Sequence, residues 1–539
     1  MRRRLLWLAV VLSLYVGIAK DSRHHWHEGR YVYSAANFGI GTLVDGGFDP
    51  GPPGARSNRE VGAWYWGQIF HEILLSIHAK LFGRGLMSLS ILEWTYGLFV
   101  PIATLVMFVT LRGLPLNGDA GQVALISLLS PLGAYLGFKL MAESPALLFG
   151  TASLYFSSRL LEPQTTVTRA IYVMGACIGL ALCALSMVYM PLMILGFWAA
   201  LLAVFGRELG YRRLLATSLL VSAGGLLVIA AVLRGYTLKL MDYLELYAYF
   251  SQYVKPASVS VFGVMLAGSL LYLLVPLSLL SERKRDLAFY AVWLAGSWLP
   301  VLIFSRNYIE PRFLSVGLVP FAGMLALSFE VLVRRATKRG SPDTIRTFVR
   351  ALSAVVVASV AYISQPLMPF EMNSRDLFEA AKGIWRVDPK AQVVVPWNYT
   401  DYHLLKLAFP ERPVYLVQAP VDNEGRVLFD EVWMKRQRAN YGEGYISNSR
   451  ELSRLDGSPI YYLGHGILPP FASLRSTAEF LRMGFVSRQI DAIRPMNHLA
   501  QSWMWHNPEY VFDPAGGVGE YQVFRVGLST TPVRGGHAE

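Results

Sequence analysis

The sequence has little charge. Only 16% of its 539 residues are Asp, Glu, Lys or Arg, whereas about a quarter is usual in soluble domains. Hydrophobic residues make up 53%, and they occur in runs of roughly 17 to 25 residues, which is long enough to cross a bilayer as helices. The composition therefore excludes an ordinary soluble protein and predicts a polytopic α-helical membrane protein.

Cysteine is also scarce. The chain has two, Cys177 and Cys183, and both fall within one apolar run. Their separation corresponds to about 9 Å of helical rise, which is too far for a disulfide within that helix. The cysteines therefore indicate no redox compartment. The chain also lacks internal repeats and low-complexity tracts.

We expect about eleven transmembrane helices. The first has a basic start and an apolar middle, like a signal peptide, but no small-x-small cleavage site follows it. We therefore interpret it as an uncleaved helix. The predicted spans lie near 4–19, 88–111, 121–140, 144–161, 169–186, 188–206, 214–233, 260–281, 287–305, 313–333 and 348–365.

The distribution of Lys and Arg predicts the orientation. With the N-terminal "MRRR" in the cytoplasm, the basic connections "GRELGYRR", "SERKRD" and "VRRATKRGSPDTIRTFVR" also fall inside, as the positive-inside rule requires. The net charge of +12 is then a consequence of topology, and the basic loops meet anionic membrane lipid. The charge needs no nucleic-acid partner.

Two domains are expected. Residues 1–366 form the transmembrane module, and residues 20–87 form a first outer loop with helices lying at the membrane interface. Residues 367–539 form a soluble extracytoplasmic α/β domain, because "AQVVVPW", "RPVYLVQA", "SPIYYLG" and "GEYQVFRVGL" are typical of strands. The stretches "SRDLFEAAKGIWR" and "LRSTAEFLRMG" are typical of helices.

Ionisable residues gather at the outer face on this topology. Asp21 and Glu28 lie in the first loop, Glu143 lies at the turn after the third span, and Arg306 and Arg312 flank the tenth. Each alone could be a solvated loop residue. Together they indicate a site, because ionisable residues beside a membrane are costly and usually functional.

Several of these motifs resemble the GT-C glycosyltransferases, polytopic enzymes that take sugars from polyprenyl-phosphate carriers. "HEGRY" (27–31) resembles their "DE-x-x-Y" first-loop motif, and "HWHE" (25–28) resembles "H-x-D-E" of the mannosyltransferase branch. "NYIEPRF" resembles the late "H-K-E-x-R-F" motif of that branch, and "AESPALLFG" resembles the acidic start of the fourth helix. The resemblance covers roughly residues 1 to 335.

The resemblance implies roles for individual residues. The family's aspartate is replaced by His27, so the proton acceptor would be Glu28 or Asp21, or the enzyme would be inactive. A leaving phosphate would be held by Arg312, Arg306 and Arg30, since arginine binds phosphate through two parallel hydrogen bonds. Alternatively, Arg306 and Arg312 could only snorkel to lipid headgroups. The other substrate-binding candidates are Glu143, Glu310, His27 and Tyr31.

A divalent metal is the one cofactor for which the sequence offers candidate ligands. His24, His25 and His27, with Asp21 and Glu28, could ligate zinc or manganese. Clusters of histidine in loops are usually solvated, and neighbouring residues of an extended segment point apart. We therefore predict no firm metal site.

The sequence thus predicts an inverting GT-C-type glycosyltransferase, either hexosyl or pentosyl. It would use a polyprenyl-phosphate sugar and a glycan, lipid or protein acceptor, on the outer face of a bacterial inner membrane. A transporter or flippase for lipid-linked glycans is the alternative, although transporters place charged residues near mid-membrane. A polymerase of lipid-linked glycans is a third hypothesis.

Overall fold

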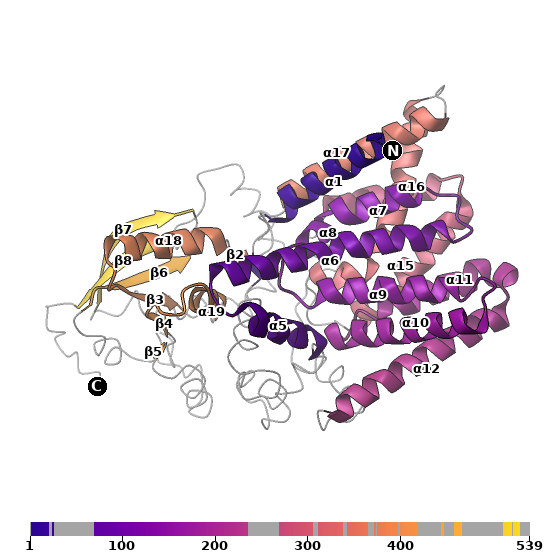
Figure 1. The fold of residues 1–539 in the computed structure, drawn as a ribbon. Helices are drawn as coiled ribbons and strands as arrows, with labels where there is room; N and C mark the ends of the chain where they lie inside the picture. Colours follow the sequence, from indigo (N-terminus) through magenta and orange to yellow (C-terminus); the bar gives the residue numbers. More distant parts are fainter. Residues whose placement is uncertain are drawn as a thin grey trace, which may run out of the picture. The chain divides into compact units, whose positions relative to one another are not determined.

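The protein is described from a computed structural model, shown in Figure 1. The structure describes residues 2–20, 24–25, 69–235, 269–304, 311–337, 342–364, 371–372, 374–396, 399–417, 444–446, 458–465, 510–519 and 521–528. These form two compact units. The first takes α1 and the helices between Leu92 and Met368, and the second takes Glu72–Ile91 and the chain from Pro369. We describe each unit separately.

The first unit is helical (Figure 1). Its elements are α1 (Arg2–Lys20), α6 (Leu86–Arg112), α7 (Ala120–Leu129), α8 (Pro131–Leu136), α9 (Glu143–Arg159), α10 (Thr166–Ser186), α11 (Leu192–Leu209), α12 (Tyr211–Gly235), η1 (Leu270–Leu280), α15 (Lys284–Phe304), η2 (Pro311–Gly317), α16 (Leu318–Ala336) and α17 (Pro342–Ser364). An additional helix, α5 (Ile69–Phe82), precedes α6. The division between the two units falls within α5 and α6.

A helical segment lies at each of the eleven predicted spans. Six of the described helices are long and apolar enough to cross a membrane, which confirms a multi-pass membrane protein, while the number of eleven stays a prediction. The third span was expected as one helix and is two. Ser130 ends α7 and caps α8, and Pro131 cannot continue the hydrogen-bond ladder of α7 because it has no N–H.

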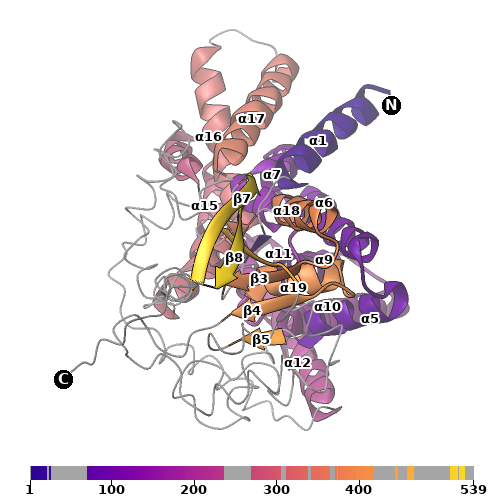
Figure 2. The same ribbon diagram turned by 90° about the vertical axis from the view of Figure 1, so that its left-hand side faces the viewer.

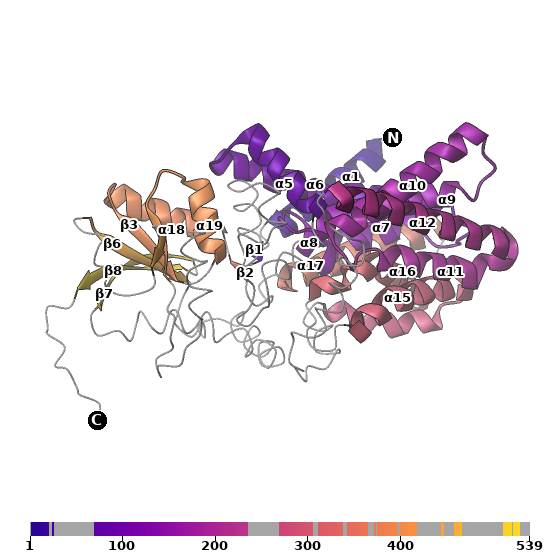
Figure 3. The same cartoon turned by 90° about the horizontal axis from the view of Figure 1, so that it is seen from below.

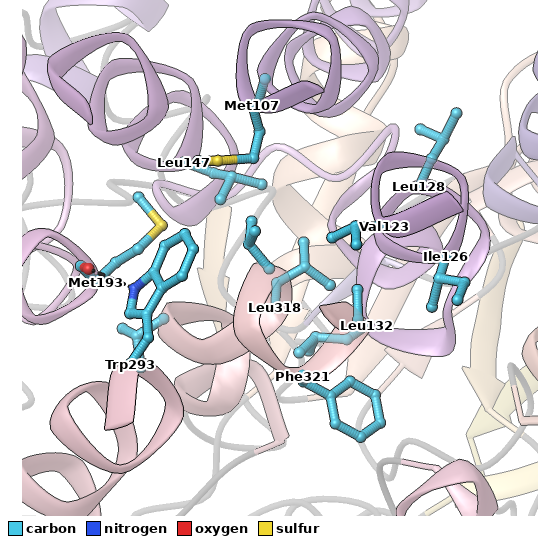
Figure 4. Packing of buried hydrophobic residues seen from close by; sticks show 14 of the residues in the cluster. Met107, Val123, Ile126, Leu128, Leu132, Leu147, Met193, Trp293, Leu318 and Phe321 are labelled. Carbon is cyan, nitrogen blue, oxygen red and sulfur yellow. Dashed lines mark hydrogen bonds between the residues drawn. The ribbon is translucent and has the colours of Figure 1, made fainter. Parts of the chain in front are cut away.

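Helix α16 is the centre of this unit. Of the apolar stretch within Arg312–Ala336, which joins η2 and α16, 89% is buried, against 22% for α12. Helix α16 packs against α7, α15, α17 and η1. Figure 4 shows Leu318 and Phe321 of α16 gathered with Val123 and Ile126 of α7 in the main apolar cluster. In Figure 3, α11, α15 and α16 follow one another side by side.

Two glycines allow α11 and α15 to cross closely. A Cβ atom added at Gly196 would lie 2.6 Å from Ser297 Oγ and 2.7 Å from the Trp293 carbonyl oxygen, and one at Gly296 would lie 2.8 Å from Gly196 Cα. Small residues let helix backbones approach in this way. The Trp293 indole N–H then donates to the Met193 carbonyl oxygen over 2.8 Å, and Figure 4 shows both side chains.

Ion pairs join the helix ends that are expected inside the cell. Asp119 caps α7 and pairs with Arg350 of α17 over 2.7 Å. Arg283 pairs with Glu330 over 3.0 Å, and Asp286 accepts a hydrogen bond from the Asn117 N–H over 3.2 Å. These contacts tie the connection between α6 and α7 to α15, α16 and α17.

The second unit contains a mixed sheet in the order β5-β4-β3-β6-β8-β7 (Figure 1), and Figure 2 shows the same sheet from another side. Strands β5, β4, β3 and β6 are parallel, while β8 runs antiparallel to β6 and to β7. The elements are β3 (Gln392–Pro396), β4 (Val414–Val417), β5 (Tyr445–Ile446), β6 (Ile460–His465), β7 (Tyr510–Val518), β8 (Tyr521–Leu528), α18 (Ser374–Val387) and α19 (Tyr399–Ala408).

The predicted α/β character of this unit is confirmed. All four predicted strands are present as β3, β4, β6 and β8, and the first predicted helix is α18. Three further elements that build or cover this sheet, β5, β7 and α19, were not predicted. The second predicted helix, at 474–484, lies outside the described residues. A separate pair, β1 (His24–His25) with β2 (Glu371–Met372), is antiparallel.

The crossing of α11 and α15 yields the first prediction. Gly196→Ala should lower the apparent melting temperature of the purified protein, at a cost of about 1–3 kcal/mol, because its Cβ would overlap the backbone of α15. Gly17→Ala is the matched control, since nothing lies within 4 Å of the added methyl group. Equal melting temperatures for the two variants would contradict the close crossing.

The Asp119–Arg350 pair yields a prediction about pH. Burial raises the pKa of Asp119, but the Arg350 guanidinium and the N–H groups of Gly121 and Gln122 outweigh it, so the pKa falls below the ordinary 3.8. A carboxylate with a lowered pKa stabilises the fold above its unfolded pKa and loses this effect as pH falls through its folded pKa. Melting curves of wild type and Asp119→Asn should therefore differ at neutral pH and converge below about pH 4. A constant difference down to pH 2 would contradict this.

Candidate active site

Glu143 is the first residue of α9 and is almost fully buried, at 1% exposure. The connection 137–142, which contains Lys139, leads into it from α8. A carboxylate in the first turn is favoured by the helix dipole. That effect is small beside the cost of removing a charge from water, so a buried carboxylate needs a partner.

Two side chains from distant parts of the sequence meet Glu143. The Tyr189 hydroxyl donates to Glu143 Oε1 over 2.7 Å, and Arg312 Nε lies 3.6 Å from the same oxygen. Tyr189 belongs to the turn between α10 and α11, and Arg312 belongs to η2. Arg312 is itself buried, at 8% exposure. Three turns at the predicted outer ends of the helices thus converge on one carboxylate.

An aromatic ring lines this group. The Phe313 ring centroid lies 5.1 Å from that of Tyr189 in an edge-to-face arrangement, and the Arg312 guanidinium carbon lies 5.3 Å from the Phe313 centroid. The ring therefore contacts both residues that hold Glu143. Apolar walls reduce the local dielectric constant, which strengthens each electrostatic contact inside.

A second buried cation, Lys139, lies four residues before Glu143. It is 1% exposed, and its ammonium group stands 3.5 Å from the Tyr135 ring centroid. Buried lysine is rare and costly. Both α8 and α9, the helices that flank Lys139 in sequence, pack against η2, which carries Arg312.

The backbone before Lys139 is strained. Phe138 has a φ of 60°, the one non-glycine residue with positive φ in the described part of the chain, and such a conformation costs of order 1–3 kcal/mol. Its ring packs so closely on Gly97 that an added Cβ there would lie 2.6 Å away. Strain of this kind clusters at functional sites, so the segment 137–143 is the strongest local signal of one.

A buried histidine lies elsewhere in the first unit. His71 of α5 is fully buried, and its Nδ1 lies 2.7 Å from the Tyr96 hydroxyl of α6. The sequence had indicated only an interfacial helix here. The signal that could have identified it is "FHEIL", two neighbouring ionisable residues within an apolar stretch.

The structure brings two predicted site residues together, Glu143 and Arg312. Burial of Arg312 against a carboxylate favours a site residue over one that snorkels to headgroups. Tyr189 and Lys139 were not predicted. The remaining candidates lie outside the described residues: Asp21, His27, Glu28, Arg30, Tyr31, Arg306 and Glu310.

The described residues include no group of three or more His, Cys, Asp or Glu side chains that could hold a metal. Of the predicted metal ligands, His24 and His25 are described as strand β1, and the others lie outside the described residues.

The geometry can bind an anion next to a hydroxyl. Within the described residues, this region holds two buried cations, Lys139 and Arg312, and one carboxylate, Glu143. Buried cations suit a phosphate, which arginine binds through paired hydrogen bonds. A carboxylate oxygen beside it can accept a hydrogen bond from a sugar or acceptor hydroxyl.

Comparison with known proteins gives a fold. No family model and no curated protein matches the chain. Among solved structures it is similar to ArnT from Cupriavidus metallidurans bound to undecaprenyl phosphate, with a TM-score of 0.52 and 12% identity over 97% of both chains. It is also similar to the apo oligosaccharyltransferase of Archaeoglobus fulgidus, with a TM-score of 0.48 and 13% identity over 98% of this chain and 74% of that one.

Both solved proteins are GT-C superfamily glycosyltransferases. The chain shares the fold of ArnT, and the predicted helical membrane module with a C-terminal α/β domain is confirmed. At these identities the comparison shows the fold alone, and the branch of the superfamily stays a prediction.

Proposed function

We propose that this chain is a membrane glycosyltransferase that moves a sugar from a polyprenyl-phosphate donor to a glycan, lipid or protein acceptor. The observation that carries the proposal is the buried group of Glu143, Arg312 and Tyr189, set where three turns at the predicted outer face converge. The GT-C-like fold supports it, and the ArnT structure of that fold contains undecaprenyl phosphate.

The two buried cations suit the donor phosphate. When the glycosidic bond breaks, the leaving phosphate gains negative charge, so a cation fixed against it stabilises the transition state more than the ground state. Arg312 and Lys139 supply this charge in our proposal, and Arg306 and Arg30 are further candidates. A buried position favours the role, because electrostatic contacts are stronger away from water.

The reaction also needs a proton acceptor. The acceptor hydroxyl loses its proton as it attacks the oxocarbenium-like carbon, and a carboxylate within hydrogen-bond reach takes it. Glu28 is our candidate and Asp21 the alternative. Glu143, Glu310, His27 and Tyr31 bind substrate in this scheme. A direct single displacement of this kind inverts the sugar carbon, whether the sugar is a hexose, such as mannose, or a pentose.

A transporter or flippase of lipid-linked glycans is less consistent with the described residues. Transporters place charged groups at helix breaks near mid-membrane. The break between α7 and α8 at Ser130 and Pro131 has no charged residue beside it. The charges of this segment lie further along, at Lys139 and Glu143. A polymerase of lipid-linked glycans would share the donor and differ in its product.

The proposed location is a bacterial inner membrane, with the site and the C-terminal domain outside. The basic connections support this orientation. A reporter fused after Glu539 should accordingly be active as a periplasmic alkaline phosphatase and inactive as a cytoplasmic fluorescent protein. The reverse pattern would place the site inside and contradict the proposal.

Binding of undecaprenyl phosphate tests the phosphate site without knowledge of the sugar. Arg312→Ala should weaken binding by the purified protein about tenfold to a hundredfold, and Arg312→Lys by less, because lysine keeps the charge but loses the paired hydrogen bonds. Native mass spectrometry or a fluorescence titration would measure it. Arg159→Ala is the matched control, since Arg159 pairs with Glu162 at the other end of α9.

Transfer itself is tested in single turnover with undecaprenyl-phosphate mannose, and with a pentose donor in parallel, using native membranes as the acceptor source. Arg312→Ala should lose transfer, and Glu28→Gln should lower it by about 10²–10⁴. Loss in Asp21→Asn alone would move the proton acceptor to Asp21. Unchanged binding and transfer in Arg312→Ala would overturn the proposed phosphate site.

A further inference from the structure

We infer that Tyr189 is a positioning residue, which fixes Glu143 so that one carboxylate oxygen holds Arg312 and the other meets a hydroxyl of the transferred sugar. This inference rests on the proposed function. It assigns a role to a residue that no motif identified, in the turn between α10 and α11.

Tyr189 and Arg312 contact the same carboxylate oxygen of Glu143. The Tyr189 hydroxyl and Arg312 Nε both act on Glu143 Oε1, at 2.7 and 3.6 Å. The Arg312 contact, at 3.6 Å, is an ion pair that is too long for a hydrogen bond. The tyrosine therefore makes the shorter contact. Within the described part of the chain, both contacts of Glu143 engage this oxygen. Oε2 is therefore the oxygen that can accept from a substrate hydroxyl.

The tyrosine is itself held in place. Its ring packs edge-on against Phe313, with centroids 5.1 Å apart, and Phe313 follows Arg312 in η2. The Ser315 hydroxyl donates a hydrogen bond to the sulfur atom of Met190, the next residue of the turn, over 3.4 Å. The turn and η2 thus pack together at two successive positions. A carboxylate can rotate about its last torsion, which has a broad preference, and a fixed hydroxyl donor removes that freedom.

A sugar hydroxyl suits Oε2 better than the phosphate does. A carboxylate oxygen accepts hydrogen bonds only, and a phosphate of the donor offers acceptors and negative charge. The hydroxyls of a hexose or pentose offer donors. In this arrangement Arg312 binds the phosphate and Glu143 binds the sugar. The Tyr189 hydroxyl holds the Glu143 carboxylate in the orientation that both contacts need.

The division can be measured by comparing two ligands. Tyr189→Phe should leave the affinity for undecaprenyl phosphate within about twofold. It should lower single-turnover transfer from undecaprenyl-phosphate mannose, or from the pentose donor if that is the one used, about tenfold, which is the loss expected for one hydrogen bond to a charged group. Tyr172→Phe is the matched control, because Tyr172 lies in α10 with its ring 6.1 Å from Phe156, and its hydroxyl makes no hydrogen bond within the described residues.

A double-mutant cycle separates positioning from packing. In a Glu143→Ala background, Tyr189→Phe should cause no further loss of transfer, because the hydroxyl then has no carboxylate to hold. Independent, additive losses would overturn the inference, as would an equal loss of undecaprenyl phosphate affinity in Tyr189→Phe. The same cycle read by melting temperature reports whether residues 189 and 143 are coupled.

The outcomes distinguish the inference from the proposed function. Wild-type protein that neither binds undecaprenyl phosphate nor transfers a sugar would refute the proposed function. Wild-type protein that does both, with coupling of Tyr189 and Glu143 in melting temperature but none in transfer, would refute the positioning role alone.

Discussion

The first unit depends on the cost of placing charge inside an apolar helical bundle. A charge removed from water must meet an opposite charge or several hydrogen bonds, or the bundle is destabilised. The buried carboxylate Glu143 meets this requirement through Arg312 and Tyr189, whereas the partly exposed Asp119 pairs with the partly exposed Arg350. The two groups occupy opposite ends of the helices. Between the two ends, the interior is packed with apolar side chains around α16.

The membrane fold could be predicted because it depends on local composition. Apolar runs and basic connections placed helical segments at all the expected spans. Glu143 and Arg312 were predicted for the same reason, since a charge beside an apolar run is visible in the sequence. Tyr189 and Lys139 were not, because each lies at the outer end of a predicted span, where tyrosine and lysine are common. Their roles depend on turns that meet only in the folded chain.

In the C-terminal domain, too, only the elements with a clear local sequence pattern could be predicted. Strands β3, β4, β6 and β8 are rich in valine, isoleucine and tyrosine, and these were predicted. Strand β7 contains Pro514, Gly516 and Gly517, which usually indicate a turn. In the sheet these residues sit at a bulge, between Pro514 and Gly516, on the edge strand, where proline and glycine are tolerated. Helix α19 has ten residues, too few to give a clear periodicity.

The place of β8 in the sheet has a consequence for biosynthesis. Strand β8 lies between β6 and β7, and β6 has β3 on its other side. Until the segment up to Leu528 has been made, the edge of β6 that later pairs with β8 keeps unpaired N–H and C=O groups, the kind of surface on which sheets aggregate. Chains fold from their N-terminal parts during synthesis, but this sheet can close only after β8 arrives. The helical unit would therefore be inserted in the membrane before the domain after it is complete, and the emerging strands would need protection in the interval.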